Sequence, residues 1–60
     1  MGVGELTAED VEREFPGWHV WLGVSSLWYA RRVLSSPPVI VRAETLTELR
    51  EAIKKRLGLP

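Results

Sequence analysis

Aromatic and titratable side chains gather in one stretch, GWHVWLGVSSLWYARR, at residues 17–32. It holds the three tryptophans, the one tyrosine and the one histidine of the chain, and it ends in two arginines. In a small protein such rings either fill the core, where each tryptophan buries about 150–250 Å², or form an exposed surface that contacts a partner. The choice depends on which face of a strand each ring occupies.

Groups typical of catalysis are few. Four serines, at positions 25, 26, 35 and 36, lie in segments typical of turns, and His19 lies beside Trp18, as a packed strand residue does. The acidic residues between Glu5 and Glu14 fit a solvated helix face. Without cysteine, and with one histidine, the chain lacks the usual ligands of a transition metal. No glycine-rich phosphate loop is present. We therefore expect no enzymatic activity, no metal and no cofactor.

The net charge is zero, but the charges are divided unevenly. Residues 1–30 carry five acids and one arginine, whereas residues 31–60 carry seven bases and three acids. Two helices could neutralise each other within the fold, or a basic face could meet an anionic partner. The neutral total argues against strong nucleic-acid binding without sequence preference, since that depends on many phosphate contacts.

Helix signals stand at both ends of the chain. Thr7 is a good N-cap with Asp10 three residues later, and Pro16 stops the helix, which predicts a helix over residues 8–15. Thr45 and Glu48 form a T-x-x-E capping box at the start of a second helix, residues 46–57. This helix carries an apolar stripe and a favourable Glu51–Lys55 pair, and Gly58 ends it.

Between the helices, β-branched and aromatic residues predict strands at 18–22, 27–34 and 39–43. Short connections favour a three-stranded antiparallel meander. The expected fold is thus α+β, one domain over residues 1–60 in the order α-β-β-β-α, with both helices on one face of the sheet. So short a chain has a marginal core, which self-association would stabilise. No signal peptide or membrane-spanning run is visible, so the cytoplasm is the expected location.

Strand alternation divides the rings between two faces. A four-residue turn at 23–26 pairs Leu22 with Leu27, and we expect Leu34 to pair with Val39. Small alanines favour the Trp21/Trp28 face as the one under the helices. The predicted open face then carries the residues expected to bind a partner: Trp18, Tyr29, Arg31, Ile40 and Arg42.

Such a face has three interpretations. It closes a homodimer or binds another protein, it stacks on single-stranded nucleic acid, or arginine stems and the N-terminal residues cover it. The protein-binding interpretation predicts a small interaction protein, antitoxin-like or regulatory. The nucleic-acid interpretation is the alternative function. Nothing predicts a membrane or a small-molecule substrate.

Two resemblances accompany this interpretation. FPGWHVW, LWYARR and VIVRAETLTELREAI, between residues 14 and 57, resemble short proteins of high-GC actinobacteria that combine a tryptophan-rich hairpin with an A-x-T-x-x-E-L helix, and this resemblance implies no activity. VRAETLTELREAIKK is similar to the last strand and helix of HicB-like antitoxin domains. The matching residues are Ala43, Thr45, Glu48, Leu49 and Ile53. That resemblance implies a β-β-β-α core, a toxin ribonuclease as partner and frequent dimers. The acidic strand residues and the proline-glycine-cysteine stretch of that family are missing, so no binding residue is carried over.

Overall fold

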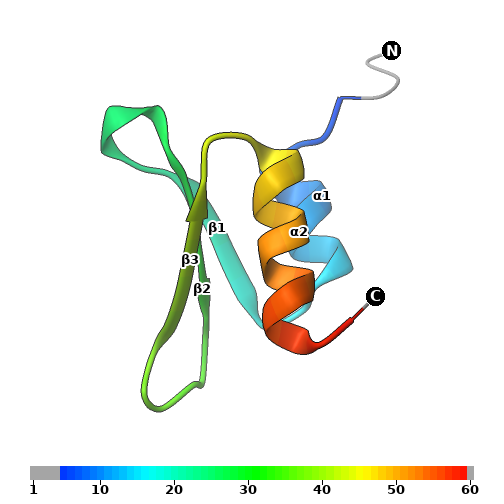
Figure 1. The fold of residues 1–60 in the computed structure, drawn as a ribbon, viewed down its shortest axis with the longest axis vertical. Helices are drawn as coiled ribbons and strands as arrows, with labels where there is room; N and C mark the ends of the chain where they lie inside the picture. Colours follow the sequence, from blue (N-terminus) through cyan, green and yellow to red (C-terminus); the bar gives the residue numbers. More distant parts are fainter. Residues whose placement is uncertain (1–4, 60) are drawn as a thin grey trace.

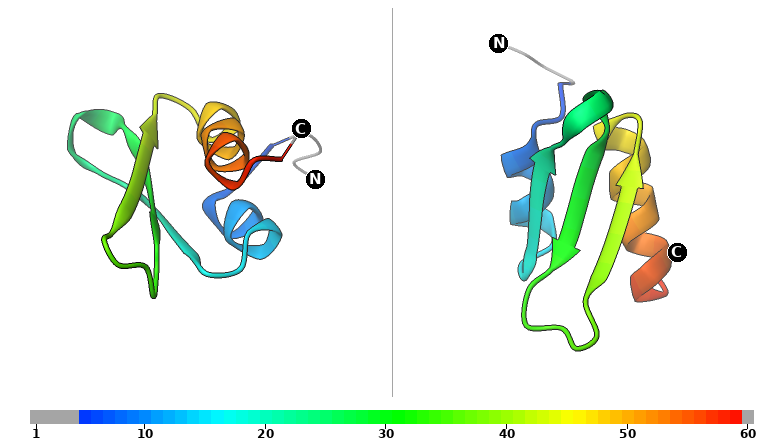
Figure 2. Two further views of the ribbon diagram at one scale, coloured as in Figure 1. Left: turned by 60° about the horizontal axis from the view of Figure 1, so that its bottom comes forward. Right: turned by 90° about the vertical axis from the view of Figure 1, so that its left-hand side faces the viewer.

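The structure is a computed structural model, and it describes residues 5–59. Its elements are α1 (Ala8–Glu14), β1 (Trp18–Leu22), the 3₁₀ turn η1 (Val24–Ser26), β2 (Trp28–Arg32), β3 (Val39–Ala43) and α2 (Leu46–Leu57). The strands form one antiparallel sheet in the order β1-β2-β3. Both helices cover the same face, α1 over β1 and α2 over β3 and β2 (Figures 1 and 2). The predicted α+β fold is confirmed.

Helix α1 begins at a complete capping box. The Thr7 hydroxyl accepts from the Asp10 backbone N–H, and the Asp10 carboxylate accepts from the Thr7 N–H, both at 3.1 Å. The helix ends at Glu14, one residue before the predicted end. Phe15 has left the helical region, at φ −123° and ψ 79°, because Pro16 disfavours helical backbone before it. Seven residues are too few for a stable isolated helix, so α1 depends on packing against the sheet.

Helix α2 has the predicted bounds. The Thr45 hydroxyl accepts from the Glu48 N–H at 3.1 Å, which is one half of the expected capping box. Gly58 ends the helix at φ 75°, a left-handed conformation that glycine adopts without steric cost. Leu49 and Ile53, one turn apart, are fully buried and anchor the helix on the sheet.

The connection between β1 and β2 is longer than predicted. Leu22 lies opposite Trp28 rather than Leu27, because five residues, 23–27, separate the strands instead of four. Within this connection the turn Val24–Ser26 holds two serines at positive φ. The additional residue shifts the pairing of β1 by one position.

That shift reverses both faces of β1, since strand side chains alternate. Trp18 and Val20 point toward the helices and are buried, at 6% and 5% exposure. His19 and Trp21 lie on the opposite face. The prediction that the helices cover Trp21 is therefore wrong, and so is the placement of Trp18 on the open face.

Strands β2 and β3 keep their predicted faces although their pairing also differs. Val39 lies opposite Arg32 rather than Leu34, a shift of two residues, which preserves the side-chain alternation. The second strand is shorter than the predicted 27–34, ending at Arg32, and Leu34 adopts a positive φ of 63° in the connection that follows. This connection also contains a cis peptide bond between Ser36 and Pro37.

The core lies between the sheet and the two helices. Its buried members are Val11, Phe15, Trp18, Val20, Ala30, Leu49 and Ile53. Trp28 is packed against this cluster but is only partly buried. One of the three tryptophans is thus a core residue, and it is not one of the two that the alternation argument placed under the helices.

Candidate interaction surface

The sheet face opposite the helices carries three pairs of side chains, one pair from each strand. We call it the outer face and define it by His19, Trp21, Tyr29, Arg31, Ile40 and Arg42. Neither helix covers it, as the right-hand view of Figure 2 shows. The pairing places His19, Arg31 and Ile40 in one row across the strands. The second row holds Trp21, Tyr29 and Arg42.

Three rings of the outer face stack on one another. The rings of His19 and Trp21 lie 5.3 Å apart between centroids at 21°, and those of Trp21 and Tyr29 lie 5.6 Å apart at 13°. The Tyr29 ring also lies against Gly23, where a Cβ would collide with it. Each stacked pair stabilises the sheet by about 0.5–1.5 kcal/mol beyond area burial. Because the Trp21 ring stacks on both His19 and Tyr29, it offers mainly its edge to a partner.

The outer face is cationic. Arg31 and Arg42 are exposed, and within residues 5–59 neither forms an ion pair. Ile40, 55% exposed, lies directly opposite Arg31 on the neighbouring strand. The face therefore combines two available guanidinium groups with an apolar side chain and ring edges, a composition typical of protein-binding surfaces.

One carboxylate connects α1 to the rim of this face. Glu12 Oε2 accepts a hydrogen bond from the Val20 backbone N–H at 2.7 Å and lies 3.2 Å from Nδ1 of His19. The Val20 N–H points away from β2, at the outer edge of the sheet. The Trp18 N–H, on the same edge, donates to the Phe15 carbonyl at 3.2 Å. Glu12 of α1 and Phe15, just after the helix, thus accept hydrogen bonds from two of the three outward N–H groups of β1.

Four of the five residues expected to bind a partner lie together on the outer face: Tyr29, Arg31, Ile40 and Arg42. The fifth, Trp18, lies in the core on the other side of the sheet. Sequence reasoning placed His19 and Trp21 on the wrong face. The signal that could have identified them is the length of the turn, which the sequence GVSSL leaves ambiguous by one residue.

On the opposite layer, an ion pair joins the helices. Arg50 donates from Nε and from a terminal nitrogen to the two oxygens of Glu14, at 2.6 and 2.7 Å. These hydrogen bonds hold the pKa of Glu14 below its ordinary value of 4.5 and raise that of Arg50. Arg50 also contacts Glu51, which pairs with Lys54 at 3.8 Å. The expected Glu51–Lys55 pair is not formed.

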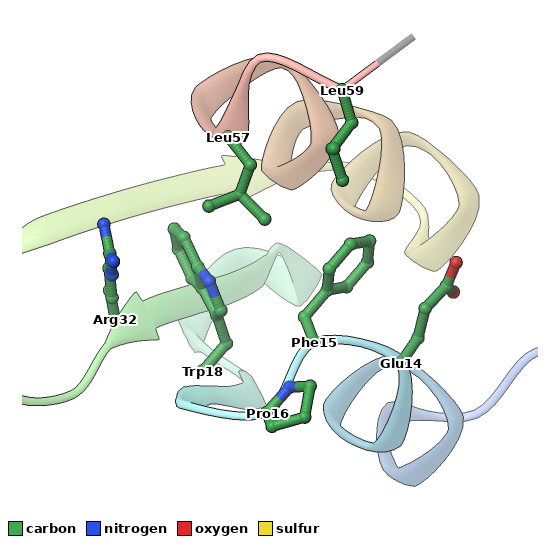
Figure 3. A pocket seen from close by; sticks show the side chains of 7 residues that line it. All are labelled: Glu14, Phe15, Pro16, Trp18, Arg32, Leu57 and Leu59. Carbon is green, nitrogen blue, oxygen red and sulfur yellow. The ribbon is translucent and has the colours of Figure 1, made fainter.

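A pocket of about 380 Å³ opens between the ends of the helices and the sheet (Figure 3). It is lined by Glu14, Phe15, Pro16, Trp18, Arg32, Leu57 and Leu59. Phe15 and Trp18 in its wall belong to the core, whereas Pro16, Leu57 and Leu59 are exposed. Glu14 is already neutralised by Arg50. The pocket brings together no nucleophile and base, so its geometry favours no reaction.

Across residues 5–59, no group of three or more histidine, cysteine or acidic side chains could hold a metal ion. No helix in the same part of the chain is long and apolar enough to cross a membrane. Comparison with protein-family models, with curated proteins and with solved structures found no match to this chain.

Proposed function

We propose that this chain is a non-enzymatic interaction module whose outer face binds an acidic surface of another protein. One observation carries the proposal: two exposed arginines without ion-pair partners among residues 5–59 flank an apolar side chain and ring edges on a helix-free sheet. Arginine and aromatic residues are the types that dominate binding energy at protein interfaces. Carboxylates are their natural complement, since guanidinium groups bind them in a bidentate geometry.

Charge argues against two copies meeting through their outer faces. In a two-fold interface the same patch contacts itself, so the two arginines of each copy would bring four guanidinium groups into one contact. Like charges placed together at an interface cost several kcal/mol. The proposed partner surface is therefore acidic and differs from the outer face itself.

Single-stranded nucleic acid fits the ring geometry less well. Base stacking needs free ring faces, whereas the Trp21 ring stacks on both His19 and Tyr29. Two arginines also supply few phosphate contacts, and the net charge is zero. The ring geometry and the charge both favour a protein partner over nucleic acid.

The test uses a probe peptide of glutamate, leucine and alanine, about 15 residues long so that it forms a helix. Amide chemical shifts of the labelled protein are followed by NMR during titration with this peptide, and separately with oligo(dT). We expect shifts at the outer face with the peptide. The double variant Arg31→Ser/Arg42→Ser should weaken binding at least tenfold.

The matched control is Arg13→Ser/Arg56→Ser, which removes the same charge from exposed residues of the helices. It should leave the affinity within about twofold, because salt screens distant exposed charges. Equal weakening by both double variants, or shifts confined to the helices, would contradict the proposal. Tighter binding of oligo(dT), with a steep salt dependence, would assign the face to nucleic acid instead.

A further inference from the structure

The two edges of the sheet differ in a way that points to self-association. On the β1 edge, the Glu12 carboxylate of α1 and the Phe15 carbonyl just after the helix accept hydrogen bonds from the N–H groups of Val20 and Trp18. The β3 edge has no such cover within the described chain. We infer that β3 pairs with β3 of a second copy, forming one continuous six-stranded sheet, and this inference stands whether or not the outer face binds an acidic partner.

The hydrogen-bond pattern identifies which groups of β3 point outward. In an antiparallel pair, facing residues alternate between hydrogen-bonded and non-hydrogen-bonded positions. The Gly23 N–H donates to the Leu27 carbonyl and the Val33 N–H to that of Gly17, each at 2.8 Å. Odd-numbered residues of β1 and β2 are therefore the ones that bond to each other, as the outward Val20 N–H also requires.

Even-numbered residues of β2 consequently bond to β3. Ala30 faces Val41 and Arg32 faces Val39, so the odd-numbered residues of β3 are engaged. The N–H and C=O groups of Ile40 and Arg42 point away from the sheet. No backbone or side-chain group of residues 5–59 bonds to them.

Two-fold pairing centred on Val41 satisfies all four of these groups. Ile40 then faces Arg42 of the second copy in a hydrogen-bonded position, and Arg42 faces Ile40 of the second copy in the same way. On the outer face this places each arginine stem beside an isoleucine rather than beside another arginine. On the inner face the two Val41 side chains, each partly buried, meet directly.

Helix α2 supplies charge complementarity for the same arrangement. It runs back along β3 (Figure 2), and its Arg50 points to α1, away from the open edge. At about 100° per residue, Glu48, Ala52 and Lys55 lie roughly 140–200° around the helix from Arg50. These three residues therefore face the open edge, with the small alanine between the two charges.

Glu48 and Lys55 form no ion pair within the described chain. They are two helical turns apart, about 10.5 Å along the axis, too far to pair with each other. An antiparallel α2 from the second copy brings Glu48 of one chain to Lys55 of the other, twice. The midpoint between Glu48 and Lys55 lies near Ala52, and the midpoint of the paired strand lies at Val41. The same two-fold axis therefore relates the two strands and the two helices.

Molar mass across a concentration series, by light scattering after size exclusion, tests the inference. The wild type should approach twice the 6.8 kDa of one chain. Ile40→Pro removes an outward N–H without breaking the bonds to β2 and should weaken the dimer at least tenfold. Leu22→Pro is the matched control, because Leu22 is equally exposed, at 55%, and lies on the other edge. It should leave the dimer intact.

Charge reversal in α2 provides a second test, which does not depend on proline being tolerated. Glu48→Lys alone and Lys55→Glu alone should each be monomeric, since each chain then repels its own copy. Mixed in equal amounts, the two variants should form a heterodimer, because the opposite charges are again paired. A monomeric wild type, a dimer that Ile40→Pro leaves unchanged, or failure of the mixture to associate would overturn the inference.

Discussion

Trp18 and Trp21 lie three residues apart on one strand, yet their removal should have different effects. Trp18 is 6% exposed, so Trp18→Ala removes the burial of nearly a whole indole, about 150–250 Å². At about 25 cal/mol per Å² this corresponds to roughly 4–6 kcal/mol. A chain of this size holds only about 3–5 kcal/mol of stability. Trp18→Ala should therefore be unfolded at 25 °C.

Trp21→Ala removes two stacked contacts on the outer face and leaves the core intact. At about 0.5–1.5 kcal/mol for each pair, the stacking accounts for roughly 1–3 kcal/mol of the loss, to which the partly buried area of Trp21 adds. This variant should fold with a lowered urea midpoint. Circular dichroism is the suitable probe, since both substitutions change tryptophan emission.

Trp18→Phe makes the core site measurable even if Trp18→Ala does not fold. It should lower the free energy of unfolding by more than Trp21→Phe does. A folded Trp18→Ala together with an unfolded Trp21→Ala would refute the reasoning. That result would mean that β1 pairs with β2 one residue out of register, with Trp21 and not Trp18 in the core.

Three further predictions concern single contacts. Glu12→Ala leaves an edge N–H of β1 without its charged acceptor and should cost about 1–3 kcal/mol in urea unfolding, while Glu9→Ala, on the same helix, should cost less. The Glu14 pKa lies below 4.5 in the fold, so the ion pair with Arg50 contributes stability above pH 4.5 that is lost as the pH falls through the lowered pKa. Thermal melts should show this acid-dependent loss diminished in Glu14→Gln, and an unchanged profile would contradict it. Gly23→Ala should destabilise the fold because the new Cβ meets the Tyr29 ring, and a double-mutant cycle with Tyr29→Ala should remove most of that penalty.

Much of the fold follows from local signals in the sequence. Thr45, Gly58 and the apolar spacing between them specify α2, because caps and periodicity act within a few residues. Strands 18–22 and 39–43 have their predicted bounds, since β-branched and aromatic runs are interrupted there by turn residues. The antiparallel order follows from short connections.

The face of β1 could not be predicted with the same means. It depends on whether the turn after Leu22 holds four residues or five, and that depends on the serines of Val24–Ser26 adopting positive φ, which non-glycine residues seldom do. A change of one residue moves every side chain of the strand to the other face. The outer face was thus predicted correctly for β2 and β3 and incorrectly for β1.

The hydrogen bond from the β1 edge to Glu12 also could not be predicted from the sequence. The Glu12 carboxylate reaches the Val20 N–H across eight residues, through the turn that reverses the chain after α1. The sequence marked Glu12 as one of several acids on a solvated helix face. Only the packing of α1 against β1 distinguishes it from its neighbours.

Amide hydrogen exchange, resolved by residue and repeated over a range of protein concentrations, tests the difference between the two edges most directly. The Val20 amide should be protected at every concentration, because Glu12 of the same chain accepts its hydrogen bond. The Ile40 and Arg42 amides should exchange freely in dilute solution and gain protection as the concentration rises. An unprotected Val20 amide would show that Glu12 does not cap the β1 edge. Protection of Ile40 and Arg42 that does not change with concentration would show that β3 does not pair with a second copy.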